Sequence, residues 1–295
     1  MLDLTPWGEL SASDISEAKI CVMGVPFDGG VSCGKGAAEA PARIRSLSRY
    51  LPPYTEEMLR IDGRLYDAGD IPLDLNWERY YGNVEERAFE LLSSGRFCLF
   101  LGGDHSVTIP LQRAWLRAAR ARGEKTGVIH FESHADMCEE YDGSKWSHAC
   151  TERRAIDEGL SPDDIAFVGL RSYEADEVNW FLEHPNVMIK RARDIFREGC
   201  VAAAEQLVGK FADYGSVYLS LDIDVLDPAF APGTGTPEAG GLSSRELMEM
   251  LKLLLPGIPI KAMDIVEVSP PLDTANGITA WAALKLIYEA LYYSK

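Results

Sequence analysis

Short apolar runs recur along the chain, and their pattern predicts buried β-strands. Each run is nearly continuous in apolar residues, which is typical of strands that are covered on both faces of a sheet. The six clearest runs are Lys19–Gly24, Phe97–Leu101, Thr126–Phe131, Ile165–Gly169, Ser216–Leu221 and Ile258–Asp264.

Segments with helical periodicity lie between these runs. They span Ala37–Leu47, Val84–Ser93, Val107–Arg122, Val178–Phe181, Val201–Phe211 and Thr279–Tyr292. One more helix start is marked by Ser243 and Glu246, which have the spacing of a capping box before Leu247–Leu251. Strands and helices therefore alternate, and no repeat or long linker divides them. The pattern predicts a single α/β domain over residues 1–295, with three layers around a mostly parallel sheet.

Composition narrows the class of protein further. The chain has 295 residues, 46% hydrophobic and 25% charged, which excludes a disordered or fibrous protein. Its 29 Lys and Arg against 46 Asp and Glu give a net charge of −17. This charge disfavours nucleic acids and anionic membranes as partners and favours cationic ligands. With no signal-peptide pattern, no membrane-length apolar run and six scattered cysteines, we expect a cytoplasmic protein with reduced thiols.

Ligands of open parallel sheets bind where the strands end, so the polar residues after each apolar run are candidates for chemistry. Four segments combine carboxylates and imidazoles at such places. They contribute His105; Glu132, His134 and Asp136; Asp222 and Asp224; and Glu267. Residues at alternate positions of an extended segment share one face, so the members of the second and third groups can converge.

Such a collection of side chains indicates a metal centre. Clustered carboxylates repel one another unless a cation lies among them. Oxygen ligands mixed with imidazole suit Mn²⁺, Zn²⁺ or Fe²⁺ better than Ca²⁺, and two bridged metals can deprotonate a water for hydrolysis. A lone histidine at a strand end is more often structural, and we expect this of a buried His130. Of the five histidines, however, only His184 lies outside these segments and the segment around His148.

At this point the sequence resembles the ureohydrolase family of arginases and agmatinases. The resemblance covers nearly the whole chain. It rests on segments Gly24–Asp28, Asp67–Asp70, Gly102–Ser106, Ser220–Pro228, Ala231–Pro237 and Gly240–Leu242. It implies the arginase-like fold with about eight strands, and assembly into trimers or hexamers. It also implies two divalent ions, usually Mn²⁺, whose bridging hydroxide attacks a guanidinium carbon and releases urea.

The resemblance also implies roles for individual residues. One metal would be held by His105, Glu132, Asp136 and Asp222, and the other by His134, Glu132, Asp222 and Asp224. His148 matches the family's proton-shuttling histidine, and Glu267 would pair with the substrate guanidinium. His148, Glu267 and Asp136 are thus the expected catalytic residues, in addition to the metal-binding role of Asp136.

The chain departs from the family pattern at three places. Glu132 stands where the family has its bridging aspartate, so one added methylene must be absorbed by a rotated carboxylate or a shifted backbone. Ala149 and Cys150 replace a Gly-Thr pair that is common in agmatinases. Cys138 stands where arginases use an asparagine to hold the substrate's α-carboxylate, so arginine is not the expected substrate.

We therefore expect hydrolysis of agmatine to putrescine and urea, as in polyamine biosynthesis. The acidic Glu139, Glu140 and Asp142 favour a dicationic substrate. Guanidinobutyrate, guanidinopropionate and guanidine remain alternatives, and a carboxylate tail would require a cation in the pocket. Arginines that could supply it are Arg153, Arg154 and Arg171.

Two other classes of function stay open. In a thiol hydrolase or amidinotransferase, Cys138 or Cys150 near His148 would attack the guanidinium carbon. In a non-catalytic binding protein, the fold would be kept while Glu132 marks a lost metal bridge. Metal content and urea release distinguish the three classes.

Overall fold

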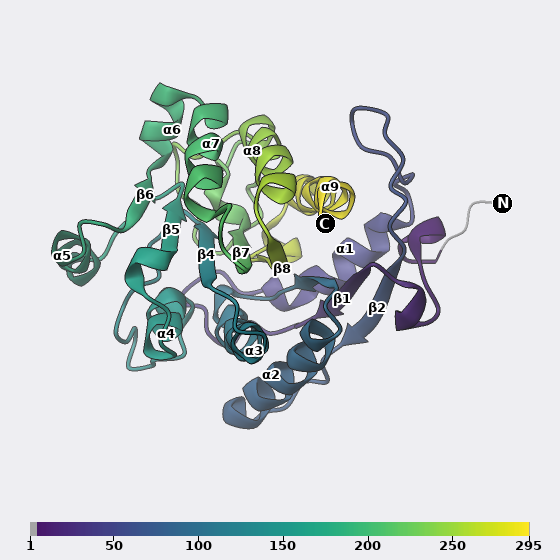
Figure 1. Ribbon diagram of the computed structural model, residues 1–295, viewed down its shortest axis with the longest axis horizontal. Coiled ribbons are helices and arrows are strands. Elements are labelled where there is room, and N and C mark those ends of the chain that lie inside the picture. Colours follow the sequence, from purple (N-terminus) through teal and green to yellow (C-terminus); the bar gives the residue numbers. More distant parts are fainter. Residues whose placement is uncertain (1–4, 295) are drawn as a thin grey trace.

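The computed structural model describes residues 5–294 and shows one parallel β-sheet between two layers of helices (Figure 1). Within these residues the sheet has eight strands in the order β2-β1-β3-β8-β7-β4-β5-β6, and every neighbouring pair is parallel. The strands are β1 (Ile20–Gly24), β2 (Leu65–Asp70), β3 (Phe97–Leu101), β4 (Thr126–Phe131), β5 (Ile165–Val168), β6 (Met188–Lys190), β7 (Ser216–Asp222) and β8 (Ile260–Val266). The predicted α/β fold with a parallel sheet is confirmed.

The helices divide between the two faces of the sheet. One face is covered by α1 (Ala40–Ser48), α6 (Ala192–Glu198), α7 (Cys200–Phe211), α8 (Ser244–Gly257) and α9 (Ile278–Tyr293). The other face is covered by α2 (Trp77–Ser93), α3 (Thr108–Ala121), α4 (Thr151–Asp157) and α5 (Ala175–Glu183). Two hydrophobic cores result, one on each side of the sheet. This double coverage explains why strands such as Phe97–Leu101 are apolar at every position.

Differences from the sequence-based expectation fall at short or weakly patterned elements. Helices α4 and α6 and strand β6 were not predicted. The two helices have seven residues each and the strand has three, and segments this short show too little periodicity. Strand β2 was expected only from the resemblance, since Leu65–Asp70 is half polar at the sheet edge. Helix α8 begins at the predicted capping box, where the Ser243 side chain accepts from the backbone N–H of Glu246.

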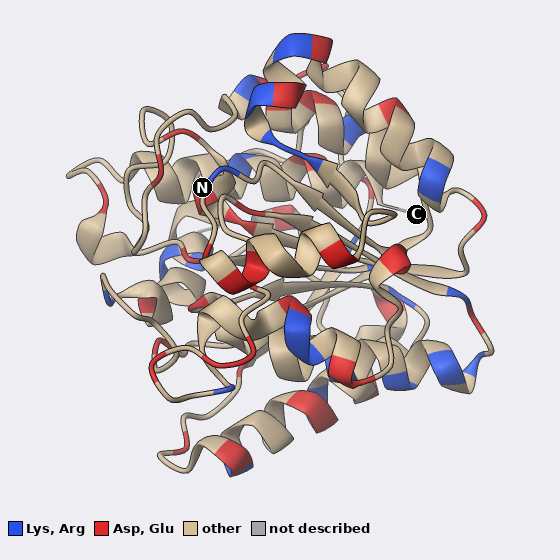
Figure 2. Ribbon diagram, turned by 90° about the vertical axis from the view of Figure 1, so that its left-hand side faces the viewer, with Lys and Arg blue, Asp and Glu red and all other residues tan. Residues whose placement is uncertain are grey.

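Acidic residues outnumber basic ones and lie on many elements of the chain (Figure 2). Asp and Glu lie on helices and loops all over the molecule, with Lys and Arg between them (Figure 2). All six cysteines are unpaired. Among the described residues, every helix is too short or too polar to traverse a lipid bilayer.

Candidate active site

Four adjacent central strands bring the predicted residues to one edge of the sheet. In the sheet order β3, β8, β7 and β4 are neighbours, and their carboxyl ends point the same way. His105 follows β3, Glu267 follows β8, and Asp222 ends β7. Glu132, His134 and Asp136 follow β4, and Asp224 follows Asp222. Residues up to 162 positions apart, such as His105 and Glu267, therefore come into direct contact.

The backbone at this edge is irregular, which differs from the extended alternation that we expected. Strand β4 ends at Phe131, and Asp136 adopts a left-handed φ of 52°. Glu267 has a φ of 60°, also left-handed, directly after β8. Asp222 caps a short 3₁₀ turn at Ile223–Val225 and accepts from the N–H of Asp224. The side chains thus converge through tight turns, and such strained residues are typical of functional sites.

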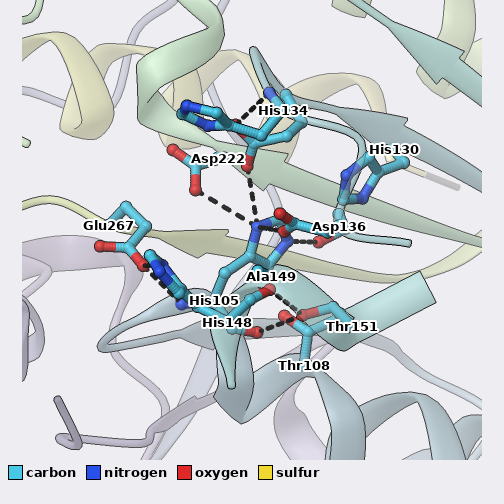
Figure 3. Close-up of polar contacts among 12 residues, drawn as sticks. His105, Thr108, His130, His134, Asp136, His148, Ala149, Thr151, Asp222 and Glu267 are labelled. Carbon is cyan, nitrogen blue, oxygen red and sulfur yellow. Dashed lines mark hydrogen bonds and ion pairs between the residues drawn. The ribbon is translucent and has the colours of Figure 1, made fainter. Parts of the chain in front are cut away.

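Three carboxylates surround one nitrogen of His105 (Figure 3). Nδ1 of His105 lies 2.9 Å from Oε2 of Glu132, 3.0 Å from Oδ2 of Asp136 and 3.2 Å from Oδ2 of Asp222. All four side chains are buried. These four residues are the ones to which the resemblance gives the first metal.

A second group forms around His134. Its Nδ1 lies 3.1 Å from Oε1 of Glu132 and 3.2 Å from Oδ2 of Asp224. Glu132 therefore faces His105 with one oxygen and His134 with the other. The longer side chain of glutamate spans both groups, and its Oε1 also accepts from the N–H groups of Ser133 at 2.7 Å and His134 at 3.0 Å.

The electrostatics of the cluster indicate a place for cations. Burial lowers the pKa of His105, but Asp136, Asp222 and Glu132 outweigh it and hold the pKa well above its usual value. Burial, Asp224 and Glu132 raise the pKa of Asp222 well above its usual value. Carboxylates packed this closely are stabilised as anions when positive charge lies among them. The donors, carboxylate oxygens plus the Nδ1 atoms of His105 and His134, suit divalent transition-metal ions.

A polar network behind His105 was missed by the sequence analysis. Nε2 of His105 lies 2.8 Å from Oγ of Ser220, which donates to Oδ1 of Asp264 at 2.8 Å. With Nε2–H donating to Ser220, the lone pair of Nδ1 faces the carboxylates, as a metal ligand requires. The signal was present in the sequence, because Ser220 precedes Asp222 by two positions on one strand and Asp264 is a buried acid within β8.

His130 is fully buried, as expected, although it lies closer to the cluster than a remote core residue would. Its ring stacks on that of His105 with centroids 5.0 Å apart. Its Nδ1 lies 3.1 Å from Oε1 of the buried Glu152. One ring nitrogen of His130 also lies within 4.8 Å of ligand atoms of His105, Glu132 and Asp136.

A different pair forms beside the two carboxylate groups. Nδ1 of His148 lies 3.2 Å from Oε1 of Glu267, which also accepts from the backbone N–H of His105 at 2.9 Å. Burial lowers the pKa of His148, but the facing Glu267 carboxylate outweighs this and raises the pKa to about 9. The imidazole is therefore in its positively charged form, with a proton on each nitrogen, near neutral pH.

Both clusters open into one cavity of about 170 Å³. The residues that line it are Ser32, Glu132, His134, Asp136, Cys138, Tyr141, His148, Ala149, Ser172, Tyr173, Glu174, Glu177, Asp222 and Thr236. Cys138 is 2% exposed, and burial, followed by Glu177, raises the pKa of its thiol. Burial raises the pKa of Cys150 to about 12. Neither cysteine is a ready thiolate, so the structure gives the thiol mechanism no support.

The charged residues considered for substrate tails lie outside this lining. Arg171 donates to the backbone carbonyl oxygens of Gly169, Asp224 and Glu238. Arg153 and Arg154 form ion pairs with Glu139 and Asp157, at 2.9 and 3.1 Å. Glu139, Glu140 and Asp142 are exposed and also do not line the cavity. Besides the acids of the two clusters, the acids that line the cavity are Glu174 and Glu177, which were not expected from the sequence.

Similarity to known proteins covers the whole of this architecture. The family model described as Arginase family matches residues 18–292. A guanidinobutyrase of Pseudomonas aeruginosa is 35% identical over 95% of this chain and 88% of its own length. An agmatinase of Bacillus cereus is 34% identical over 95% of this chain and 93% of its own. The crystal structure of agmatine ureohydrolase of Thermoplasma volcanium superposes with a TM-score of 0.87 at 29% identity, covering 99% of this chain and 95% of that one. The chain belongs to the arginase family of binuclear-metal amidinohydrolases.

Proposed function

We propose that this enzyme hydrolyses a guanidino compound with a cationic tail, and that the substrate is agmatine, which yields putrescine and urea. One observation carries the choice: among the described residues that line the cavity, Glu174 and Glu177 are present and Lys and Arg are not. A buried carboxylate tail needs a cationic partner, whereas an ammonium tail is stabilised by carboxylates. Guanidinobutyrate and guanidinopropionate would have no such partner here.

The two acids differ in what they can offer to a substrate. Glu177 is buried, and its oxygens accept from the backbone N–H groups of Met137 and Glu174, both at 2.8 Å. It therefore shapes the wall. Glu174 is exposed at the rim, where a flexible ammonium tail can reach its carboxylate. We assign recognition of the tail to Glu174.

The metal-binding residues follow from the two carboxylate groups. His105, Glu132, Asp136 and Asp222 would hold one ion, and His134, Glu132, Asp222 and Asp224 the other. In these positions two divalent ions would supply a nucleophile, because they would lower the pKa of a water. We propose Mn²⁺ as the native ion, because the donors are mostly carboxylate oxygens and hard oxygen ligands suit Mn²⁺.

The other residues act on the organic substrate. Glu267 accepts N–H donors of the guanidinium and thereby orients its carbon toward the carboxylate cluster. His148 holds a proton at neutral pH and delivers it to the nitrogen that leaves as the amine, which makes that nitrogen a better leaving group. Ser220 and Asp264 keep His105 in the tautomer that binds through Nδ1.

We further propose a single-domain, cytoplasmic protein that assembles with copies of itself. An exposed apolar face supports self-association, because Leu182 is 74% exposed and Phe196 is 84% exposed beside a groove of about 780 Å³. Light scattering at several concentrations tests this, and a monomer at all of them would contradict it.

The substrate is tested by urea release with agmatine, guanidinobutyrate, guanidinopropionate, arginine and guanidine, each with Mn²⁺, Zn²⁺, Ni²⁺ or Fe²⁺. Metal content is measured on the same samples. We expect two ions per chain and the highest kcat/KM for agmatine. Preference for a carboxylate-tailed substrate would overturn the proposed substrate and keep the hydrolase. Protein without metal that releases no urea under any condition would favour a binding protein.

A further inference from the structure

Ser32 contacts the nitrogen of His148 that Glu267 does not occupy. Oγ of Ser32 lies 2.9 Å from Nε2 of His148, and the backbone N–H of Ser32 donates to the same nitrogen at 3.2 Å. Ser32 is exposed and lines the cavity. The two nitrogens of this imidazole thus have different neighbours, a carboxylate at Nδ1 and a solvent-accessible hydroxyl at Nε2.

The loop that carries Ser32 is fixed to the active site on both sides of this residue. Before it, the N–H of Gly30 donates to Oδ2 of the buried Asp104 at 2.6 Å, and the carbonyl of Gly30 accepts from the N–H of His148 at 3.1 Å. After it, Gly34 has a φ of 63°, and a Cβ there would lie 2.5 Å from Cα of Gly235. The position of Ser32 is therefore set by contacts with the segments that form the cavity.

The hydroxyl of Ser32 suits both proton states of the imidazole, whereas its backbone N–H suits only a bare Nε2 and so favours release of the proton. When Nε2 carries a proton, Oγ of Ser32 accepts it in a hydrogen bond. When Nε2 is bare, the N–H and O–H of Ser32 both donate to it. A residue that supports both states lowers the cost of moving a proton on and off the ring, whereas one that supports a single state would trap it.

We propose that Ser32 relays the proton between His148 and the departing amine, a role that rests on the proposed hydrolase function. As the C–N bond breaks, its electron pair stays on the amine nitrogen. The Nε2 proton of His148 passes to Oγ of Ser32 while the hydroxyl proton of Ser32 passes to the amine. The hydroxyl is unchanged, His148 becomes neutral, and solvent water re-protonates it along the exposed side of Ser32.

The test compares Ser32→Ala, Ser32→Thr and, as a matched control on the same loop, Cys33→Ala. Cys33 is the exposed neighbour of Ser32 and does not line the cavity. In the Mn²⁺-loaded enzyme with agmatine, we expect Ser32→Ala to lower kcat by about 10- to 100-fold, a part of the usual effect of general acid–base catalysis. KM and metal content should change little. Ser32→Thr, which keeps the hydroxyl, and Cys33→Ala should keep most of the activity.

A second readout does not depend on turnover. Nitrogen NMR of the histidine side chains in Zn²⁺-loaded protein reports the proton on Nε2 of His148, since Zn²⁺ has a filled d shell and does not broaden the signal. We expect this resonance and its pH titration to move in Ser32→Ala and not in Cys33→Ala.

The outcomes separate this proposal from the function on which it rests. Unchanged kcat and an unchanged Nε2 resonance in Ser32→Ala would overturn the relay. Equal losses in Ser32→Ala and Ser32→Thr would also overturn it, because they would show a need for the shape of serine rather than its hydroxyl. A wild type that releases no urea from agmatine would instead contradict the proposed substrate, while the NMR comparison would still decide whether Ser32 bonds to His148.

Discussion

The cavity has two halves built from the same residue types. In the metal half, His105 faces three carboxylates and His134 faces two. In the acid–base half, His148 faces one carboxylate, Glu267, and one hydroxyl, Ser32. An excess of carboxylates needs a cation that stays, whereas one imidazole with one carboxylate is balanced by a proton that can leave. The number of acids around each ring therefore separates a metal ligand from a proton carrier.

The halves also differ in how they are held. His105 and its carboxylate partners are buried and fixed by contacts behind them, such as the one between Ser220 and Asp264. His148 and Ser32 are partly open to solvent. A site for ions needs rigid geometry, and a site for proton transfer needs access to water. Substitutions in the metal half should therefore lower metal content together with activity, whereas substitutions in the acid–base half should lower turnover alone.

The largest effect is expected for Asp222→Asn, because Asp222 faces His105 and shares its group with Glu132. Removing this charge should lower metal content well below two ions per chain and activity by about 10³-fold or more, since the metals supply the nucleophile. Elemental analysis and urea release measure both quantities. Asp213→Asn, an exposed acid of the same chain, is the control. Full metal content with full activity in Asp222→Asn would contradict the assignment of Asp222 as a metal ligand.

His148→Asn should show the opposite combination. Turnover should fall by about 10²- to 10³-fold, because general acid–base catalysis contributes effects of this size. Metal content should stay at the wild-type value, since the polar partners of the His148 ring are Ser32 and Glu267, which are not among the proposed metal ligands. Loss of metal in this variant would show that His148 is a metal ligand.

Much of the arrangement of the active site could be predicted from the sequence. The strands that carry the metal half are long, apolar and central, and each ends in a polar motif, so their shared edge follows from the rule for parallel sheets. Asp222 lies beside His105 and Asp224 beside His134, which are the neighbours that the proposed metal groups require. The resemblance gave His148 and Glu267 separate roles, and only the structure shows that these residues, 119 positions apart, are in contact.

Other parts of the site could not be predicted, and the reason is physical. Ser32 and Glu174 lie in loops, where a serine or glutamate has no periodicity that assigns it a direction. The convergence of Glu132 and Asp136 was predicted from extended alternation, but the backbone that produces it includes a left-handed Asp136 that no local pattern required. Whether Arg171 enters the cavity was undecidable from sequence, since its hydrogen bonds reach carbonyl groups up to 67 positions away.

The pH dependence of kcat tests the role of His148 in the acid–base half. His148 has a pKa of about 9, raised by Glu267 and, at longer range, by Asp136 and Asp104, against the lowering effect of burial. The proton donor is therefore present below pH 9, and kcat should fall as pH rises through 9. In Glu267→Gln the main raising influence is lost and burial remains, so this fall should shift to lower pH by about one unit or more. The same variant should lose about 10²-fold in kcat/KM at neutral pH, because the guanidinium loses its carboxylate.

Metal content is the control for Glu267→Gln, and it should match that of the wild type. A profile that falls at the same pH in both proteins would show that the group titrating near pH 9 is not His148.

Glu132→Asp tests the bridge between the two metal groups. The two oxygens of Glu132 face His105 and His134 separately, and shortening the side chain by one methylene draws it away from at least one of them. We expect the affinity for one of the two ions to change by about 10-fold, within the range seen for altered metal surroundings, and the order of metal preference to change with it. Titration with Mn²⁺ and Zn²⁺ measures this, and identical affinities in both proteins would contradict a bridging role.

The smallest effect is expected at the rim, for Glu174→Gln. This change keeps the size of the side chain and removes the charge that we assign to the ammonium tail of the substrate. KM for agmatine should rise by about 5- to 10-fold, as for one partly exposed ion pair of roughly 1 kcal/mol, with kcat and metal content unchanged. KM for guanidinobutyrate, whose tail is repelled by Glu174, should fall. Glu140→Gln, an exposed acid outside the cavity lining, is the matched control. If both variants raise KM for agmatine equally, the effect comes from the overall negative charge of the protein, and Glu174 does not recognise the tail.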